Sequence, residues 1–288
     1  MVAFPTETVY GLGADAANAA AVRRVFAVKG RPLGHPVIVH LADRSQIDEW
    51  ARAVPPAARV LAERFWPGPL TLVLPRSARA SDLVTGGQDT VALRVPSDPV
   101  AREILQRAGI GIIAPSANRF GTVSATRAEH VVADFGDAVD LIVDGGPAAL
   151  GIESTIVSVA GGEAAVLRPG GVSREQIEDV LGAPVRVGGG EIRVPGSLPS
   201  HYAPRAQVEV FDELAPAEER TRSLRANGVR VELLAPGGGA EAYARQLYER
   251  LREADRRGAQ TIVVVAPAEG GLGTAIRDRL RRAAGPRM

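Results

Sequence analysis

The chain has 288 residues, 45% of them hydrophobic, so it is long enough for one large domain or two ordinary ones. Its net charge of +1 gives no general attraction for nucleic acid, and the absence of cysteine excludes disulfides and thiolate metal sites. The sequence contains no apolar run as long as a membrane span, and the N-terminus lacks a basic region followed by an apolar one. We therefore expect a cytoplasmic protein without a membrane segment.

The first part of the chain alternates between candidate strands and helices. A strand over residues 1–4 leads into a loop over 5–13 that is rich in hydroxyls and glycines, and a helix over about 17–28 follows, capped by Asn18 or Asp15. The pattern predicts further strands at 37–41, 70–74, 91–95, 111–114 and 141–143. It predicts further helices at 45–51, 56–65, 98–108 and 126–135.

A hairpin follows this alternating region. Residues 154–159 and 164–167 flank Gly161-Gly162, which is typical of a tight turn between two strands. A helix over 173–181 comes next, with Ser173 as its N-cap and Gly182 just beyond its end. Because hairpins and strand–helix–strand units occur in one segment, we expect a mixed α/β sheet with helices on it.

The composition changes after this helix. Residues 188–199 are rich in glycine and proline, which indicates either a linker or an ordered loop. After Pro204, strands at 208–211, 229–234 and 261–265 alternate with helices, among them 241–257 and 274–284. This alternation predicts a second, smaller Rossmann-like α/β domain with a parallel sheet.

Lys29 is the only lysine among the 34 basic residues, so one position kept an ammonium where arginine serves elsewhere. An ammonium is a compact point charge suited to a phosphate oxygen, and Arg31 follows it in a loop stiffened by Pro32. The stretch is consistent with an anion site. It is equally consistent with a helix C-terminus that carries dipole-compensating cations and a proline stop.

Five loops hold more hydroxyls, cations and glycines than turns require: 6–13, 29–40, 114–118, 151–155 and 168–171. Three of them follow a predicted strand end, which is where open α/β sheets bind ligands. The sequence contains no Walker loop, no dinucleotide fingerprint after a strand and no nucleophile elbow. Its four histidines are too scattered for a metal cage, so we expect no metal site made by the protein.

These loops carry a resemblance. Residues 4–13 (Phe-Pro-Thr-Glu-Thr-Val-Tyr-Gly-Leu-Gly), 29–32 (Lys-Gly-Arg-Pro), 67–71 (Pro-Gly-Pro-Leu-Thr), 114–118 (Ala-Pro-Ser-Ala-Asn), 153–155 (Glu-Ser-Thr) and 168–170 (Arg-Pro-Gly) together resemble the YrdC/TsaC family of threonylcarbamoyl-AMP synthases. His-Tyr-Ala-Pro at 201–204 and the segment after it resemble the longer, two-domain form of the family. The resemblance implies a YrdC-like catalytic domain over 1–185 with a mixed twisted sheet. It further implies an ordered linker across the cleft over 186–206 and a small C-terminal α/β domain over 207–288.

The resemblance also implies an activity. Such enzymes are nucleotidyltransferases that condense L-threonine, bicarbonate and ATP to threonylcarbamoyl-AMP and pyrophosphate, with Mg²⁺ held mainly by the phosphates. The product serves the modification of the tRNA adenosine beside the anticodon, through a downstream threonylcarbamoyl transferase machinery. This chemistry needs charge neutralisation and in-line positioning more than a protein nucleophile.

By motif position, the resemblance assigns three groups of residues. The catalytic cluster would be Lys29, Arg31, Ser116 and Asn118. Threonine would be bound by Thr8, His40, Arg94, Ala114 and Ser154. ATP would be bound by Arg31, His35, Thr90, Ser116, Ser124, Arg168 and Tyr202. Taken singly, each of these has an ordinary structural interpretation, such as a turn, a loop cap or a surface arginine.

A double-stranded RNA or tRNA binding module without catalysis is the alternative function. The near-zero net charge and the lack of basic stretches interleaved with aromatics favour the enzyme, which leaves at most a weak RNA contact. For the segment 195–204, which contains three prolines, we expect a stiff cover over the cleft in which Tyr202 closes over the nucleotide. The simpler alternative is that Tyr202 only pins a linker to one domain.

Overall fold

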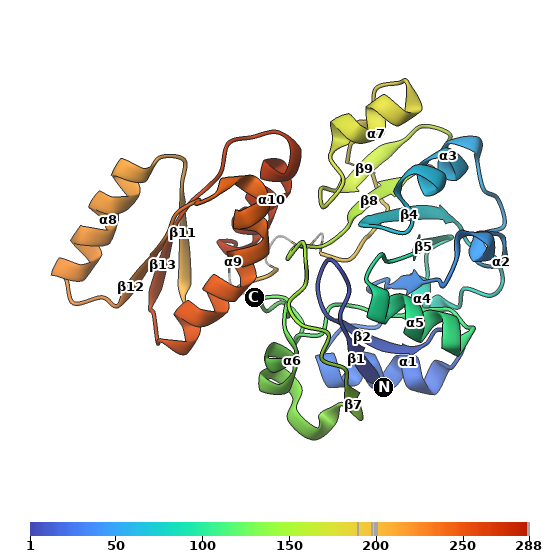
Figure 1. Cartoon of the computed structure of the whole chain (residues 1–288), viewed down its shortest axis with the longest axis horizontal. Coiled ribbons are helices and arrows are strands. Elements are labelled where there is room, and N and C mark those ends of the chain that lie inside the picture. Colours follow the sequence, from blue (N-terminus) through green and yellow to red (C-terminus); the bar gives the residue numbers. More distant parts are fainter. Residues whose placement is uncertain (189, 197, 199–200, 287–288) are drawn as a thin grey trace.

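The computed structural model describes residues 1–188, 190–196, 198 and 201–286, which form two sheets with their helices. Figure 1 shows the two sheets in separate halves of the molecule. The larger sheet has ten strands in the order β10-β9-β8-β4-β5-β3-β6-β2-β1-β7. The smaller has three, in the order β11-β13-β12. None of the helices in the described part of the chain has the length and apolar character needed to cross a membrane.

The large sheet mixes parallel and antiparallel pairs, as the sequence predicts. Its strands are β1 (Val2–Phe4), β2 (Gly11–Asp15), β3 (Ile38–His40), β4 (Leu70–Pro75), β5 (Thr90–Arg94), β6 (Ile112–Ile113), β7 (Leu141–Ile142), β8 (Thr155–Ser158), β9 (Ala165–Arg168) and β10 (Arg186–Val187). Its helices are α1 (Ala19–Lys29), α2 (Ile47–Trp50), α3 (Pro56–Phe65), α4 (Asp82–Thr85), α5 (Pro99–Ala108), α6 (Ala128–Phe135) and α7 (Arg174–Leu181). Short 3₁₀ turns at Arg44–Gln46 and Gly136–Ala138 complete this half.

The helix ends follow their sequence signals. Asn18 caps α1, its side chain accepting a hydrogen bond from the backbone N–H of Ala21, and Asp98 caps α5. Ser173 caps α7 in a reciprocal capping box, and Gly182 ends that helix in the left-handed conformation. The predicted hairpin is present as the antiparallel pair β8 and β9.

The prediction of a loop over residues 5–13 is wrong for its second half, where β2 begins at Gly11. This strand pairs antiparallel with β1, so that Gly13 lies opposite Val2. A side chain at Gly13 is excluded because its Cβ would lie 2.5 Å from the Phe4 ring. Glycine is therefore needed here for close strand packing, although its frequency in turns led us to expect a loop.

The small sheet is parallel throughout, which confirms the prediction for the C-terminal region. It is formed by β11 (Gln207–Phe211), β12 (Val231–Leu234) and β13 (Thr261–Val265), with α8 (Leu214–Ala226), α9 (Gly239–Arg256) and α10 (Gly271–Ala283). Figure 1 shows α9 and α10 on the side that faces the large sheet and α8 on the far side. Helices α9 and α10 are therefore the elements that reach the other half of the molecule.

We call the described residues between β10 and β11 the connector. Strand β10, which lies inside the range expected to be a linker, pairs with β9 and extends the large sheet. Further along, Arg193 donates from Nη1 to the carbonyl of Gly34 and from Nη2 to that of Gly86, each at 2.8 Å. The connector is thus fixed to loops of the large sheet.

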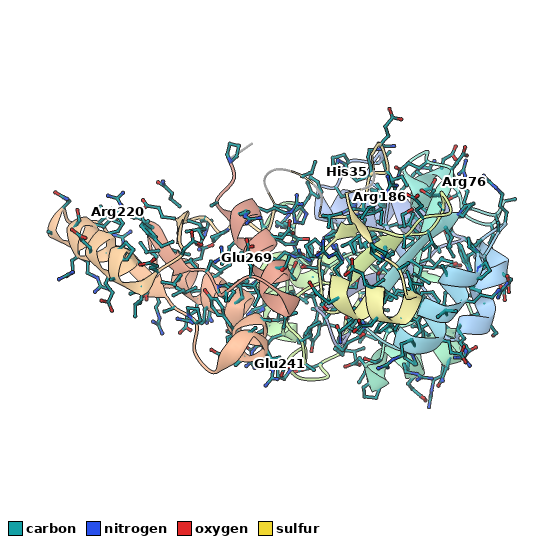
Figure 2. The ribbon with its side chains drawn as sticks, turned by 90° about the horizontal axis from the view of Figure 1, so that it is seen from above. His35, Arg76, Arg186, Arg220, Glu241 and Glu269 are labelled. Atoms are coloured by element: carbon teal, nitrogen blue, oxygen red, sulfur yellow. The ribbon has the colours of Figure 1, made fainter. Side chains whose placement is uncertain are left out.

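Exposed charged side chains such as Arg186 and Arg220 lie on the surface of both halves of the molecule (Figure 2).

Candidate functional site

One pocket lies between loops of the large sheet and the connector. It contains about 570 Å³ of space free of protein atoms, including its opening to solvent. Many of the residues that the family motifs assign to substrates line it: Thr8, Arg31, His40, Arg94, Ala114, Ser116, Ser154, Arg168 and Tyr202. The structure thus brings together residues from motifs spread over most of the chain.

Three buried arginines give the pocket its charge. Arg31 donates from Nη2 to the carbonyl of Pro36 at 2.6 Å, while its Nε has no partner among the described residues. Burial lowers the pKa of Arg31 to about 10, so this guanidinium remains charged at neutral pH, and burial also lowers the pKa of Arg168. Both guanidinium groups are buried, and neither forms an ion pair with a carboxylate in the described part of the chain. An anion entering the pocket would supply that missing partner.

Arg94, the third of these arginines, is anchored more fully. It donates from Nη1 to Thr8 Oγ1 at 2.9 Å and from Nε to the carbonyl of Gly68 at 3.2 Å. Its Nη2 lies 2.8 Å from Glu7 Oε1, an ion pair without hydrogen-bond alignment. Glu7, which received no role from the sequence, therefore helps to orient a cation of the pocket.

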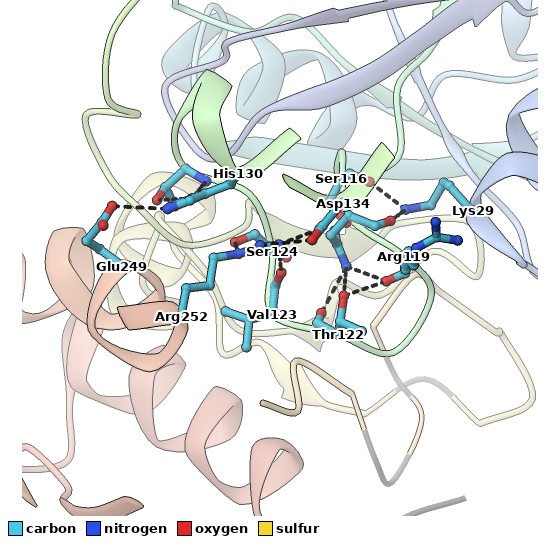
Figure 3. Close-up of polar contacts among 12 residues, drawn as sticks. Lys29, Ser116, Arg119, Thr122, Val123, Ser124, His130, Asp134, Glu249 and Arg252 are labelled. Carbon is cyan, nitrogen blue, oxygen red and sulfur yellow. Dashed lines mark hydrogen bonds and ion pairs between the residues drawn. The ribbon is translucent and has the colours of Figure 1, made fainter. Parts of the chain in front are cut away.

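Lys29 lies behind the pocket wall rather than in it. Its ammonium donates to the carbonyl of Ser116 at 2.5 Å and to that of Asn118 (Figure 3). Burial, together with the nearby Arg31 guanidinium, holds the pKa of Lys29 well below its usual range. Three members of the predicted catalytic cluster, Lys29, Ser116 and Asn118, therefore lie together. The ammonium of Lys29 holds the loop that places Ser116 in the pocket lining.

Asn118 supports the same loop. Its Nδ2 donates to the carbonyl oxygens of Arg119 at 2.7 Å and Thr122 at 2.9 Å (Figure 3). Its Oδ1 is buried and has no partner among the described residues. Asn118 does not line the pocket, and the hydrogen bonds of its side chain are made within the loop.

Uncharged polar groups surround Arg94. Thr71 and Ser154 share a hydrogen bond of 2.8 Å between their hydroxyls, and the hydroxyls of Thr6 and Thr8 are 2.7 Å apart. Burial lowers the pKa of His40 to about 3, so its ring is neutral at physiological pH. His40 Nδ1 has no partner in the described part of the chain. This side of the pocket offers neutral donors and acceptors beside one guanidinium.

Three residues assigned to ATP do not line the pocket: His35, Thr90 and Ser124. His35 lies at the edge of the large half (Figure 2). Its ring packs edge-on against the Phe120 ring, with the two ring centroids 5.3 Å apart. Thr90 begins β5 opposite Pro75 in the sheet. Ser124 is fully buried and donates its hydroxyl to Glu153 Oε1 at 2.6 Å.

The connector contributes His201 and Tyr202 to the pocket lining, and the ring centroids of these two residues are 4.2 Å apart. Tyr202 is buried and has a φ of 60°, the only positive φ outside glycine in the described residues. Its hydroxyl has no partner there, and a Cβ at Gly196 would lie 2.0 Å from that oxygen. The connector therefore packs tightly on itself at the pocket. Residues 197, 199 and 200 of the predicted cover lie outside the described residues, and the expectation that the segment 195–204 lies across the cleft stays a prediction.

Three residues at the base of the pocket received no role from the sequence. Glu153 lines the pocket and is contacted by Tyr248 and Arg279, which belong to the C-terminal half. Burial alone would raise the pKa of Glu153, but Arg279 and then Arg168 outweigh it and lower that pKa to about 2. Glu153 is part of a motif that pointed to Ser154, whereas no motif contains Tyr248 or Arg279.

The residues available to a metal ion are few. No group of three or more histidine or carboxylate side chains able to hold one occurs in the described part of the chain. Glu153 is already engaged by three donors and Glu7 is paired with Arg94.

Comparison with known proteins identifies the family. The family described as "Telomere recombination" matches residues 1–170, and the one described as "Threonylcarbamoyl-AMP synthase, C-terminal domain" matches residues 172–285. The chain belongs to the two-domain threonylcarbamoyl-AMP synthase family. A threonylcarbamoyl-AMP synthase of Pyrococcus abyssi is 40% identical over 310 residues, covering 100% of this chain and 91% of its own length.

Other members of the threonylcarbamoyl-AMP synthase family agree with this assignment. The Bacillus subtilis protein of that name is 40% identical over 316 residues, covering 100% of this chain and 90% of its own length. The crystal structure of P. abyssi Sua5 complexed with L-threonine has a TM-score of 0.93 at 39% identity, covering 98% of this chain and 90% of that chain. The similarity to this solved structure therefore extends over both halves of the chain.

Proposed function

We propose that this chain is an L-threonylcarbamoyladenylate synthase that condenses L-threonine, bicarbonate and ATP and releases pyrophosphate. One observation carries the proposal: most of the residues assigned to the two substrates, including all of those assigned to threonine, line a single pocket containing three buried arginines. Two of these arginines pair with no carboxylate in the described residues, as expected of a site that awaits an anionic substrate.

Arg31 and Arg168 would bind the triphosphate of ATP, since they provide the charge not neutralised by the protein. Arg94, fixed by Glu7 and Thr8, would hold the carboxylate of threonine in a bidentate grip. His40 is neutral, so its ring nitrogen would contact the hydroxyl or amine of threonine without adding charge. In this arrangement the two substrates meet near Ser116.

The reaction would be an adenylyl transfer, which makes the enzyme a nucleotidyltransferase. The amine of threonine and bicarbonate form a carbamate with loss of one water. An oxygen of the carbamate then attacks the α-phosphorus, the bond to the bridging oxygen breaks, and pyrophosphate leaves with the electron pair. The protein supplies position and positive charge rather than a nucleophile. Mg²⁺, held by the phosphates, would neutralise part of their charge when bound. Lys29 would keep Ser116 in place through the loop it anchors.

The connector would protect the product. A mixed anhydride is labile in water, and Tyr202 and His201 form the wall that covers the pocket. We assign the range 186–206 this covering role, between a catalytic domain over 1–185 and a C-terminal domain over 207–288. The product would pass to a tRNA threonylcarbamoyl transferase in the cytoplasm.

Pyrophosphate release, measured with each substrate omitted in turn, tests the proposal. We expect turnover only when threonine, bicarbonate and ATP are all present. Turnover without threonine would identify a simple ATP pyrophosphatase and refute the proposal. Tight, strongly salt-dependent binding to tRNA with no turnover would favour the RNA-binding alternative instead.

A further inference from the structure

Glu153 is the point at which the C-terminal half touches the pocket. Its Oε1 accepts a hydrogen bond from Ser124 at 2.6 Å, and its Oε2 accepts one from Tyr248 at 2.8 Å and another from Arg279 Nε at 2.7 Å. Helices α9 and α10 provide the last two donors. The side chains of Arg279 and Glu153 are 0% and 8% exposed, so this ion pair is shielded from solvent.

Arg279 is held on several sides. Its Nη2 donates to the carbonyl of Pro169 at 2.9 Å and its Nη1 donates to Asp278 Oδ2 at 2.6 Å. Its guanidinium lies 5.1 Å from the centroid of the Tyr202 ring. The side chain of Arg279 in α10 therefore contacts Glu153, Pro169 and Tyr202.

Arg168 is the neighbouring cation. It donates from Nη2 to the carbonyl of Ser154 at 2.7 Å and from Nη1 to that of Pro195 at 2.9 Å. It forms no ion pair among the described residues, although Glu153 immediately precedes the serine that it contacts. A buried carboxylate needs a compensating cation, and Arg279 meets that need for Glu153.

We propose that Arg279 is a positioning residue of the pocket, which pairs with Glu153 and so leaves the charge of Arg168 without a carboxylate partner and available to the phosphates of ATP. This inference rests on the proposed function. Without Arg279, the buried carboxylate would have Arg168 as its nearest remaining cationic partner, and the two would pair at the expense of the nucleotide. The C-terminal domain thus contributes a charge that tunes nucleotide affinity in the other domain.

The test uses the full chain with Arg279→Met, which keeps an unbranched apolar stem and removes the charge. We expect KM for ATP to rise about tenfold or more, and to rise more than KM for threonine, because Arg94 is not part of this network although Arg168 also contacts Ser154. The Kd of ATP measured by calorimetry should rise in parallel. An unchanged ATP affinity would refute the proposal.

The double variant Glu153→Gln with Arg279→Met separates charge competition from packing. Removing the carboxylate together with its partner should restore the Kd of ATP to within about threefold of wild type, since Arg168 then has no competitor. A double variant as weak as the single one would show that Arg279 acts only by packing, which would refute the proposal. Arg281→Ala provides the control, because this arginine lies on the same helix with a side chain 69% exposed, and it should leave ATP affinity unchanged.

Glu153→Gln alone keeps the proposal testable if Arg279→Met does not fold. Removing one negative charge beside the phosphates should leave ATP affinity equal or higher, and a fall in affinity would refute the proposal. Absence of turnover in the wild-type enzyme would instead refute the proposed function, so the two failures are distinguishable.

Discussion

The two walls of the pocket are built in different ways. The sheet wall consists of Arg31, His40, Arg94, Ser116 and other residues of the large-sheet loops, and it provides the charged groups. The connector wall consists of Pro195, Gly196, His201 and Tyr202, and it provides rings and backbone. The arginines of the sheet wall donate to fixed carbonyls, whereas the hydroxyl of Tyr202 has no partner in the described residues. We infer that the sheet wall binds and activates the substrates while the connector wall retains them.

The largest expected effect concerns Lys29, the support of the sheet wall. Lys29→Ala should lower kcat by about a thousandfold, because the loop carrying Ser116 loses the cation that binds two of its carbonyls. Lys29→Arg should recover little, since a planar fork does not fit a buried site shaped for an ammonium. Pyrophosphate release gives the rates, and thermal unfolding reports whether the variants fold. An arginine variant with near wild-type activity would reduce Lys29 to a helix-end charge.

Substrate selection tests the neutral part of the sheet wall. Replacing threonine by valine should cost about a hundredfold in kcat/KM, because groups that bind the hydroxyl would be left unpaired. Serine, which lacks only the methyl group, should cost about tenfold. A direct comparison of the three amino acids decides this, and faster turnover of valine than of serine would contradict it.

Tyr202→Ala tests the connector wall. We expect KM for ATP to rise about fivefold and the ratio of AMP to intact threonylcarbamoyl-AMP to increase, since water then reaches the anhydride. The matched control is Tyr202→Phe, which keeps the ring and removes the unpartnered hydroxyl. It should retain the wild-type product ratio. If the alanine variant also retains both quantities, the connector is a spacer.

The smallest expected effect is a dependence of folding stability on pH. Both walls contribute to it, because each contains one buried neutral histidine. Burial lowers the pKa of His40 and of His201 to about 3, against 6.5 for an exposed ring. The unfolded chain therefore binds more protons as pH falls below 6.5, and the fold loses stability. Between pH 7 and pH 6 each histidine should lower the free energy of unfolding by about 0.7 kcal/mol. Urea unfolding at both pH values should show a smaller loss for His201→Gln than for wild type, and equal losses would contradict this assignment.

How much the sequence could predict depends on the range of the interactions. The parallel C-terminal sheet was predictable because strand and helix patterns alternate locally. Strand β2 was not, because the glycine at position 13 is required by contact with Phe4 rather than by a turn. The grouping of Thr8, Arg94 and Arg168 followed from motif order. The bond from Arg279 to Glu153 joins positions 126 apart and leaves no local pattern, so only the structure reveals it.

The composition of the chain makes Lys29 a natural reporter group. Amine-directed labels and lysine-specific proteases find no other lysine in this sequence, so apart from the N-terminal amine they have a single target. Because that target is 3% exposed and its ammonium is bound to two carbonyls, the closed molecule should resist both reagents. Cleavage after residue 29 would therefore count only those molecules in which the end of α1 has separated from the 116–118 loop. The rate of cleavage at this one position would therefore measure how often the end of α1 separates from the 116–118 loop, without any engineered probe.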